Sequence, residues 1–381
     1  MKFQISSKDF ASKVTAASKA IEKKNSISIL ANIMLGKDDE GFYIIGSSTN
    51  KSLTLHLGAI PDMCDTEFTP VCLSAQTLRE VLVALPEQPL NVTISDNICV
   101  IEHSSGKFQM GAESAQDYPR IDTGEVTVTE FNIESNIFTN AVKEASLHTS
   151  KDELHRVLGC VCVDLRSIGE EGANCMSVVG CDGQTLYQYD HTRKDAIASS
   201  DIRILLPVSV VSILSDAFAN VGQITIRYCG DNIVFSASGR SLVATTPEGT
   251  YPNYLSIIPA QSTYSATINT KDFASAIKRV SLMSDGSQLI RMRFSSGAVV
   301  LSTSDIDFAK SASDSVGVVD GNIPEGMVLG AKSGNLLKVM EVLKSENVIF
   351  GVTAKDHPFV FREDKENSCL RELVMPMRVD D

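Results

Sequence analysis

A short alternation of apolar and polar residues, followed by a helical apolar pattern, recurs three times along the chain. The three segments align without gaps, begin at positions 3, 131 and 266, and read FQISSKDFASKV, FNIESNIFTNAV and ATINTKDFASAI. The alternation is typical of a strand, and the apolar spacing of three and four residues after it indicates a helix. The residue at each junction, which is Ser7, Ser135 or Thr270, is a predicted helix N-cap.

Each predicted first helix has one apolar stripe at matching positions. The stripes are Phe10, Val14, Ala17 and Ile21; Phe138, Val142 and Ala145; and Phe273, Ile277 and Val280. Phe138 follows Phe10 by 128 residues, and Phe273 follows Phe138 by 135 residues. A stripe of this spacing predicts a helix with one buried face.

Two more elements follow in the same order in every copy. A strand end that leads into a second helix is predicted at 73–78, 206–211 and 329–336, and hairpins are predicted at 91–101, 223–235 and 347–361. This repetition predicts three domains of one α+β fold, each with two helices and many strands. The expected domains are 1–124, 125–253 and 254–381. No low-complexity linker separates them, so we expect them to pack in a row.

The composition favours a folded protein of the cytoplasm. The 381 residues are too many for one ordinary core, and 43% of them are hydrophobic. No apolar run approaches the roughly 18 residues that span a membrane, and the first residues lack the apolar region of a secretion signal. The nine cysteines follow no disulfide framework, which suits a reducing compartment. We therefore expect a cytoplasmic location.

The net charge of −13 argues against a basic nucleic-acid-binding domain, but the cations are not evenly spread. The predicted first helices and their flanks carry Lys8, Lys19, Lys23 and Lys24; Lys143; and Lys271, Lys278 and Arg279. The matching helix face is thus basic in two of the three copies. It is either a solvated surface or a surface for DNA phosphates, whose contacts are sequence-independent and weakened by salt.

Motifs of catalysis and cofactor binding are absent from the sequence. It has no phosphate-binding glycine loop, no His-Glu-x-x-His and no paired Cys-x-x-Cys. The best metal candidate is the set Cys160, Cys162, Cys175 and Cys181, for which buried thiols are the preferred interpretation. We predict no cofactor, no metal and no catalytic residue. Asp182 remains as a rival acid or base, although it precedes glycine as turn residues do.

Three short motifs carry a resemblance to a known family. They are Ile29-Leu30-Ala31-Asn32 after a basic loop, Cys181-Asp182-Gly183, and the terminal Val374-Met375-Pro376-Met377-Arg378. Together with the triple repeat, they resemble the bacterial beta sliding clamp, the processivity subunit of replicative DNA polymerase, over essentially the whole chain. The resemblance implies a non-catalytic, head-to-tail homodimer. Its six domains would form a ring around duplex DNA, with helices lining the hole and sheets outside.

The resemblance also implies which residues contact DNA and partner proteins. It places Lys24 in one DNA-contacting loop, and His148 to Arg156 in another. It places a pocket that binds a short linear motif of polymerases, the clamp loader and repair proteins between the second and third domains. The matching residues are Val157, Cys181, Gly183, Gln184, Thr185, Leu186, Pro252, Ile257, Leu373, Met375, Pro376, Met377 and Arg378.

The sequence departs from the family pattern at this pocket and beyond it. Gln184-Thr185 replaces the common His-Arg, Leu154-His155-Arg156 replaces a tyrosine-bearing stretch, and Val379-Asp380-Asp381 extends past the usual end. These changes bear on the specificity of the pocket and leave its expected location unchanged.

The resemblance implies a ring interface between the first domain of one subunit and the third domain of the other. Phe108 and Met110 would meet Leu282 and Met283, and Lys107 would face Asp305 or Asp307. An edge strand that pairs with another chain satisfies its backbone groups. The alternative is that Phe108 and Met110 belong to the core of their own domain.

Two other classes of function remain open from the residues. One is a repeat-built scaffold that binds proteins without enclosing DNA. The other is an enzyme whose site forms across domains around Asp182. Retention on circular DNA is expected only of a clamp, and loss of turnover in an Asp182→Asn variant is expected only of an enzyme.

Overall fold

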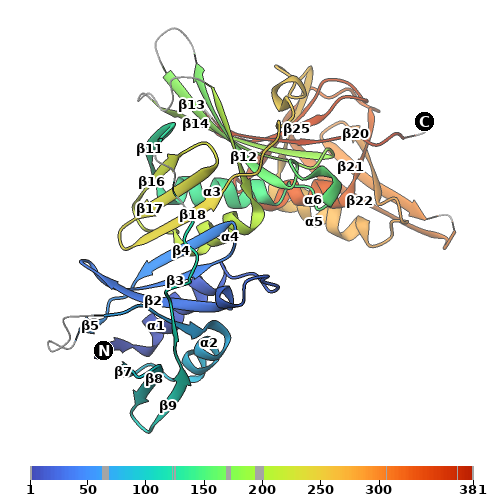
Figure 1. The fold of residues 1–381 in the computed structure, drawn as a ribbon. Coiled ribbons are helices and arrows are strands. Elements are labelled where there is room, and N and C mark those ends of the chain that lie inside the picture. Colours follow the sequence, from blue (N-terminus) through green and yellow to red (C-terminus); the bar gives the residue numbers. More distant parts are fainter. Residues whose placement is uncertain are drawn as a thin grey trace. The chain divides into compact units, whose positions relative to one another are not determined.

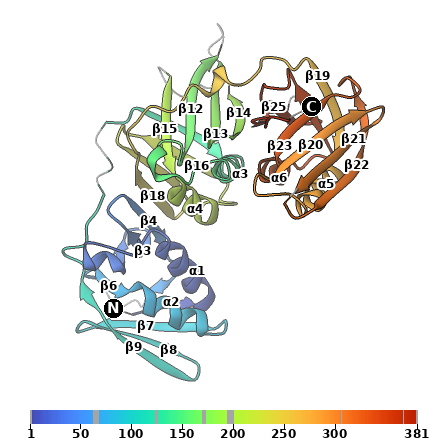
Figure 2. The same cartoon turned by 90° about the vertical axis from the view of Figure 1, so that its right-hand side faces the viewer.

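The structure, a computed structural model, describes residues 2–61, 68–121, 123, 126–168, 173–193, 201–305, 307–366 and 368–379. These residues form an α+β fold with six α-helices and three sheets, which confirms the predicted class (Figures 1 and 2). The chain divides into two compact units, Met1–Asn140 with Ser209–Pro247, and Ala141–Val208 with Glu248–Asp381. The middle predicted domain contributes to both units, and the predicted boundary at 124–125 lies outside the described residues.

The six helices are the two predicted for each copy of the repeat. They are α1 (Ser7–Ser18), α2 (Ala75–Ala84), α3 (Ser135–Ser146), α4 (Val208–Ala217), α5 (Thr270–Ser281) and α6 (Ser333–Val342). Three short 3₁₀ turns also form, at Ser28–Ala31, Glu153–His155 and Tyr254–Ser256. The strand–helix order predicted from the repeat is therefore confirmed.

The predicted N-caps are wrong by one residue. Ser7, Ser135 and Thr270 are the first residues of their helices, and in the third copy the carboxamide oxygen of Asn269 caps the helix by accepting from two backbone N–H groups. The predicted residues have a shared role instead, because each donates its backbone N–H to the loop before the hairpin. The acceptors are the carbonyls of Gln88, Gly222 and Glu346, at 2.9, 2.7 and 2.9 Å. This contact fixes the start of each first helix against its own repeat.

Two sheets belong to the first unit. The five-stranded sheet has the order β5 (Ile60–Pro61), β1 (Lys2–Ser6), β7 (Pro89–Ser95), β8 (Ile98–His103) and β9 (Gly106–Gly111). The nine-stranded sheet has the order β10 (Glu113–Ser114), β6 (Val71–Ser74), β2 (Asn32–Asp38), β3 (Gly41–Ser47), β4 (Lys51–His56), β18 (Arg240–Thr245), β17 (Asn232–Ala237), β16 (Gln223–Tyr228) and β11 (Thr129–Glu134). Backbone pairing of β4 with β18 joins the first repeat to the second, as Figure 1 shows.

One 12-stranded sheet runs through the second unit. Its order is β15 (Ile202–Pro207), β12 (Cys160–Ile168), β13 (Ala173–Cys181), β14 (Thr185–Arg193), β26 (Leu370–Val374), β25 (Phe359–Glu363), β24 (Asn347–Val352), β19 (Tyr264–Asn269), β22 (Lys310–Gly321), β21 (Ala298–Asp305), β20 (Leu289–Ser295) and β23 (Val328–Lys332). Here antiparallel pairing of β14 with β26 joins the second repeat to the third.

The helix stripes form the cores beneath these sheets. Every predicted stripe residue except Ile21 is fully buried; α1 ends at Ser18, so Ile21 lies beyond the helix and is only partly buried.

The first helices of two repeats lie unusually close to their sheets. A Cβ atom at Gly46 would lie 2.1 Å from the carbonyl oxygen of Ala17, and one at Gly180 would lie 2.0 Å from that of Ala145. These glycines therefore set the distance between helix and sheet.

Gly46→Ala should destabilise the fold, because the new methyl group has no space against the backbone of α1. We expect the free energy of unfolding to fall by about 1–3 kcal/mol, the usual cost of overpacking. Gly58→Ala is the matched control, since its Cβ would meet only the Asp9 carboxylate at 3.7 Å. Urea denaturation measures both variants, and an equal effect of the two would contradict the close packing.

A buried acid–imidazole pair lies beside the joint between the second and third repeats. Nε2 of His148 lies 3.4 Å from Oε2 of Glu372 on β26, and both side chains are completely buried. Burial and the charge of Lys338 lower the pKa of His148 to about 3. Burial, with the nearby Glu144 carboxylate, raises the pKa of Glu372 well above its usual 4.5. The imidazole is therefore neutral at neutral pH, and the raised pKa of Glu372 favours its protonated form.

Glu372→Gln should change how stability depends on pH. Folded Glu372 keeps a proton that the unfolded chain releases above pH 4.5, so its contribution to stability is lost as the pH rises. The glutamine variant should gain up to about 1.4 kcal/mol of unfolding free energy over the unsubstituted protein for each pH unit above 4.5. The depressed pKa of His148 acts in the other direction, since it costs both proteins stability as the pH falls below 6.5. Urea denaturation at several pH values tests this, and parallel pH profiles would contradict it.

Candidate functional site

One row of apolar side chains crosses the joint between β14 and β26. Cys181 on β13 pairs with Leu186 on β14, Leu186 pairs with Leu373 on β26, and Leu373 pairs with Val360 on β25. Directly paired residues point to the same face of a sheet, so the four side chains form a continuous apolar floor. Predicted pocket residues from separate repeats thus meet only because these two strands pair.

Tyrosines and partly buried aliphatic residues complete the cluster around this floor. Tyr251 and Tyr254 pack into it and are fully buried, and Val157 packs against it from the segment before β12. Ile257 and Met375 are large apolar side chains that are exposed by 40% and 38%. The predicted pocket residues therefore divide into a buried floor and an exposed apolar rim.

The turn between β13 and β14 is held by Asp182. One of its carboxylate oxygens accepts from the backbone N–H groups of Gln184 and Thr185, at 2.9 and 2.7 Å, and the other lies 2.6 Å from Nζ of Lys338. Burial alone would raise the pKa of Asp182, but the lysine and these donors outweigh it and hold the pKa below its usual value. Asp182 is thus an ionised turn residue whose oxygens are all engaged. Gly183, at φ +83°, completes the turn.

Gln184 and Thr185, which replace the family's common His-Arg pair, are both engaged in this turn. Thr185 is buried, and its hydroxyl donates to Asp182. Gln184 is exposed and accepts a hydrogen bond from the side chain of Asn335 at 3.2 Å, while its backbone carbonyl accepts from the N–H of Met375. The turn is thereby tied both to α6 and to the C-terminal segment.

The C-terminal segment continues from β26 onto β23. The backbone N–H of Met377 donates to the carbonyl of Gly330 at 2.8 Å. A Cβ atom at Gly330 would lie 2.3 Å from a methyl group of Val379, so the segment fits because this strand residue is glycine. A cavity of about 290 Å³ remains between the segment and β23, with Pro376 and Arg378 in its lining. Asp380 and Asp381 of the extension lie outside the described residues.

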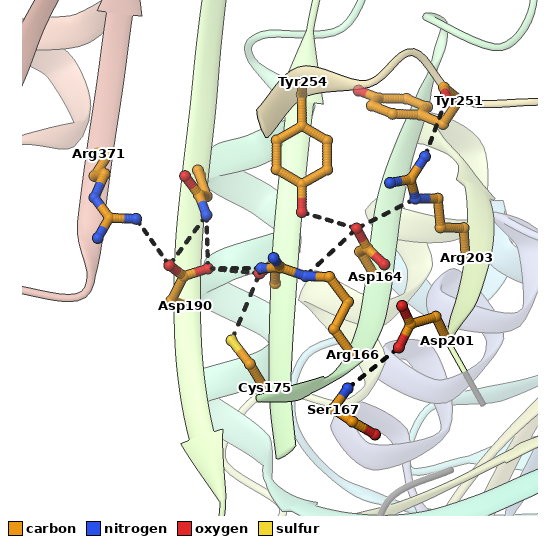
Figure 3. Close-up of polar contacts among 12 residues, drawn as sticks. Asp164, Arg166, Ser167, Cys175, Asp190, Asp201, Arg203, Tyr251, Tyr254 and Arg371 are labelled. Carbon is orange, nitrogen blue, oxygen red and sulfur yellow. Dashed lines mark hydrogen bonds and ion pairs between the residues drawn. The ribbon is translucent and has the colours of Figure 1, made fainter. Parts of the chain in front are cut away.

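The end of the same sheet face carries charged residues in place of apolar ones (Figure 3). Asp164 on β12 is fully buried, and its Oδ2 accepts hydrogen bonds from the Tyr254 hydroxyl at 2.9 Å and from Nε of Arg203 at 3.2 Å. Arg166, two residues along β12, connects Asp164 to Asp190 through the hydroxyl of Ser177; the successive atoms lie 3.6, 2.6 and 2.5 Å apart. Sequence analysis did not predict this network, because its members are far apart in the chain and match no motif.

Most cations predicted to face DNA are exposed. Among the described residues, Lys23, Lys24, Lys143, Arg156, Lys271 and Lys278 form no ion pair. Lys8, Lys19 and Arg279 pair with Glu87, Asp216 and Asp314 respectively. The prediction for His148 is wrong, because its complete burial leaves no surface for a phosphate.

A cationic cavity in the first unit adds a residue that sequence analysis missed. The cavity measures about 690 Å³ and lies among the end of α1, the start of α2 and the start of α4. Its lining includes the cations Lys19, Lys23 and Arg79, the acid Glu22, and the serines Ser209 and Ser212. Cations and hydroxyl donors around a cavity suit a phosphate group. Arg79 gave no sequence signal because it is the single cation of its helix.

The predicted interface residues lie at a strand edge and at a helix end. Phe108 and Met110 are half-buried on β9, which pairs only with β8 among the described strands, and Lys107 is exposed beside them. Leu282 and Met283, which follow α5, are exposed by 76% and 41%. These apolar residues suit an interface.

The two acidic candidates for that interface differ. Asp305 is buried and accepts a hydrogen bond from the backbone N–H of Phe308 at 3.2 Å. Asp307 is exposed. Of the two carboxylates predicted to face Lys107, only that of Asp307 is therefore accessible.

The cysteine set singled out in the sequence shows the properties of core thiols. Cys160, Cys162, Cys175 and Cys181 are all buried, and burial raises the pKa of each, to about 11 for Cys160. Thiols of raised pKa are poor metal ligands and poor nucleophiles. In the described part of the chain, no group of three or more metal-ligating residues is arranged to hold an ion.

The comparisons with known proteins agree over the whole chain. The family model of the N-terminal domain of the DNA polymerase III beta subunit matches residues 1–122, and that of its C-terminal domain matches residues 255–378. Together the two models match more than half of the chain. The beta sliding clamp of Halalkalibacterium halodurans is 23% identical and covers 99% of this chain and 100% of its own. That of Treponema pallidum is 22% identical and covers 100% of both.

Solved structures show the same fold. The DNA polymerase III beta subunit of Thermotoga maritima superposes with a TM-score of 0.86 at 18% identity, over 100% of both chains. The sliding clamp of Pseudomonas aeruginosa bound to griselimycin superposes with a TM-score of 0.88 at 16% identity, again over 100% of both chains. The matched family models, the repeat and the fold lead to one conclusion: the chain belongs to the family of DNA polymerase III beta subunits, the beta sliding clamps.

Proposed function

We propose that two copies of this chain close head to tail into a ring around duplex DNA, and that the ring tethers a replicative DNA polymerase. Each chain would supply three copies of the clamp domain, 1–124, 125–253 and 254–381. The clamps of this family are non-catalytic processivity subunits, and the chain is therefore not an enzyme. The engaged carboxylate of Asp182 agrees with this.

The proposal of DNA binding rests on the placement of cations at the helix ends. In a chain of net charge −13, the ends of α1, α3 and α5 and the start of α2 carry exposed cations without carboxylate partners among the described residues. Unpaired cations attract phosphates through contacts that read no base and therefore allow sliding.

The exposed edge of β9 supports the proposed ring closure. Residues 310–317 of β22 pair on one side with β21, and in the described structure their other edge has no strand beside it. Pairing of this edge with β9 of another copy would satisfy the backbone groups of both. It would also bury Phe108 and Met110 against Leu282 and Met283.

The apolar rim supports binding of a short linear motif. Ile257 and Met375 are exposed beside the floor of Cys181, Leu186 and Leu373, and an apolar side chain that docks here is worth roughly 1.5–3 kcal/mol. The flexible side chains of Met375 and Met377 suit a surface that accepts several partners. We propose that polymerase, clamp loader and repair proteins share this site, and that the protein acts in the cytoplasm. Among the described helices, none has the length and apolarity to cross a membrane.

Topological retention is the first test of the proposed function. The protein is loaded onto a nicked circular plasmid by a clamp loader, and gel filtration follows the bound protein before and after one restriction cut. We expect retention on the circle and loss from the linear ends, because a ring slides off. A scaffold without topological binding would give no retention on the circle, and equal retention on both forms would contradict encirclement.

Substitution of the rim is the second test. Met375→Ala and Ile257→Ala should each weaken binding of a peptide that carries the leucine and phenylalanine of the clamp-binding motif by about tenfold, or about 1.4 kcal/mol. The control is Val319→Ala, which removes another exposed apolar side chain, this one from β22. Calorimetry measures the dissociation constants, and unchanged affinity in both rim variants would contradict the site.

A further inference from the structure

The apolar floor lies under a segment that the proposed peptide site needs in a fixed place. Residues 251–257 carry two predicted pocket residues that are exposed, Pro252 and Ile257, while Tyr251 and Tyr254 of the same segment are fully buried. The segment forms one short 3₁₀ turn, Tyr254–Ser256, and no strand. Its position therefore depends on side-chain contacts with the sheet below.

Asp164 makes or supports the polar contacts that hold this segment. Its carboxylate accepts directly from the hydroxyl of Tyr254. It also pairs with Arg203, whose Nη1 donates to the backbone carbonyl of Tyr251 at 3.3 Å and whose guanidinium lies 5.9 Å from the ring centroid of Tyr254. One carboxylate thus reaches both ends of the Tyr251–Tyr254 turn, as Figure 3 shows.

The same network reaches the strand on the other side of the floor. Arg166 joins Asp164 to Ser177 and Asp190, and Asp190 accepts a hydrogen bond from Nη1 of Arg371 at 3.0 Å. Arg371 lies on β26, which also carries Leu373 and leads to Met375. Segment 251–257 is therefore connected to β26 through polar side chains on four neighbouring strands, β12, β13, β14 and β26.

Burial makes these contacts rigid and costly to break. Asp164 is 1% exposed, so its charge depends on its partners for stabilisation. Burial, together with the Asp164 carboxylate, raises the pKa of Tyr254 far above its usual value. The hydroxyl therefore stays protonated and remains a donor at any physiological pH. A charge-assisted hydrogen bond of this kind holds its donor more firmly than a neutral one.

We propose that Asp164 is a positioning residue of the peptide site, which fixes segment 251–257 through Tyr254 and Arg203 in the conformation that the bound peptide requires. This inference rests on the proposed function, because it presupposes that the site binds a peptide. A preorganised wall contributes to affinity because less ordering remains to be done on binding. A purely structural network would support the fold and leave peptide affinity unchanged.

The decisive variant is Tyr254→Phe, which removes one hydroxyl and keeps the ring in the core. We expect its affinity for the clamp-motif peptide to fall by about tenfold, and Asp164→Asn to do the same. The double variant should lose little more than either single variant, because both act through one hydrogen bond. Calorimetry on the full-length protein gives the dissociation constants.

Tyr118→Phe is the matched control for the loss of a buried hydroxyl. Tyr118 is buried in the first repeat, and its hydroxyl donates to the backbone carbonyls of Asn32 and Ile45. It should lower stability without changing peptide affinity. A second readout is amide hydrogen exchange, which should become faster in residues 251–258 of Tyr254→Phe, stay unchanged in β12, and slow again with saturating peptide.

The outcomes separate this inference from the proposed function. If the unsubstituted protein binds no clamp-motif peptide, both are overturned. If it binds the peptide and Tyr254→Phe binds equally well, the positioning role of Asp164 is overturned and the peptide site stands. If Asp164→Asn does not fold, Tyr254→Phe alone decides, because it leaves the ion pairs of Asp164 with Arg166 and Arg203 in place.

Discussion

Backbone pairing between strands of different repeats is the constraint on which the functional surfaces depend. The pairing of β14 with β26 places Leu186 beside Leu373, and it alone brings the floor of the proposed peptide site together. The pairing of β4 with β18 has the same effect in the first unit, since it connects the repeat that carries α1 and α2 to the one that carries α4. In each case a site is made from residues more than a hundred positions apart, held by hydrogen bonds that do not depend on side chains.

The sequence predicted what depends on local periodicity and missed what depends on distant contacts. The predictions of the strand–helix order, the hairpins and the buried stripes from Phe10, Phe138 and Phe273 were correct, because each follows from the spacing of residues that are close in the sequence. The helix starts were displaced by one residue, since Ser7 and its equivalents contact a loop of their own repeat that lies far along the chain. A tertiary contact therefore decides where each helix begins, and no local sequence pattern reveals that contact.

The candidate sites show the same division between local and distant information. Cys181, Leu186 and Leu373, which the resemblance assigned to one pocket, share one buried cluster, whereas His148, which it assigned to a DNA-contacting loop, is buried against Glu372. Arg79 stands alone on its helix, and Asp164 matches no motif, so neither could be found without the fold. Their roles arise from neighbours contributed by other strands and helices. Burial and pairing, rather than residue type, distinguish them from the many other charged residues of the chain.

The contact between the C-terminal segment and Gly330 has a consequence for how the protein behaves in a crowded cell. β23 is an edge strand of the 12-stranded sheet, and an uncovered strand edge is a template on which other chains aggregate. The hydrogen bond from Met377 and the side chain of Val379 occupy part of that template. If Met375 binds partners as proposed, the residues that follow it would also cover this edge, so one short stretch of chain would serve both solubility and partner recognition.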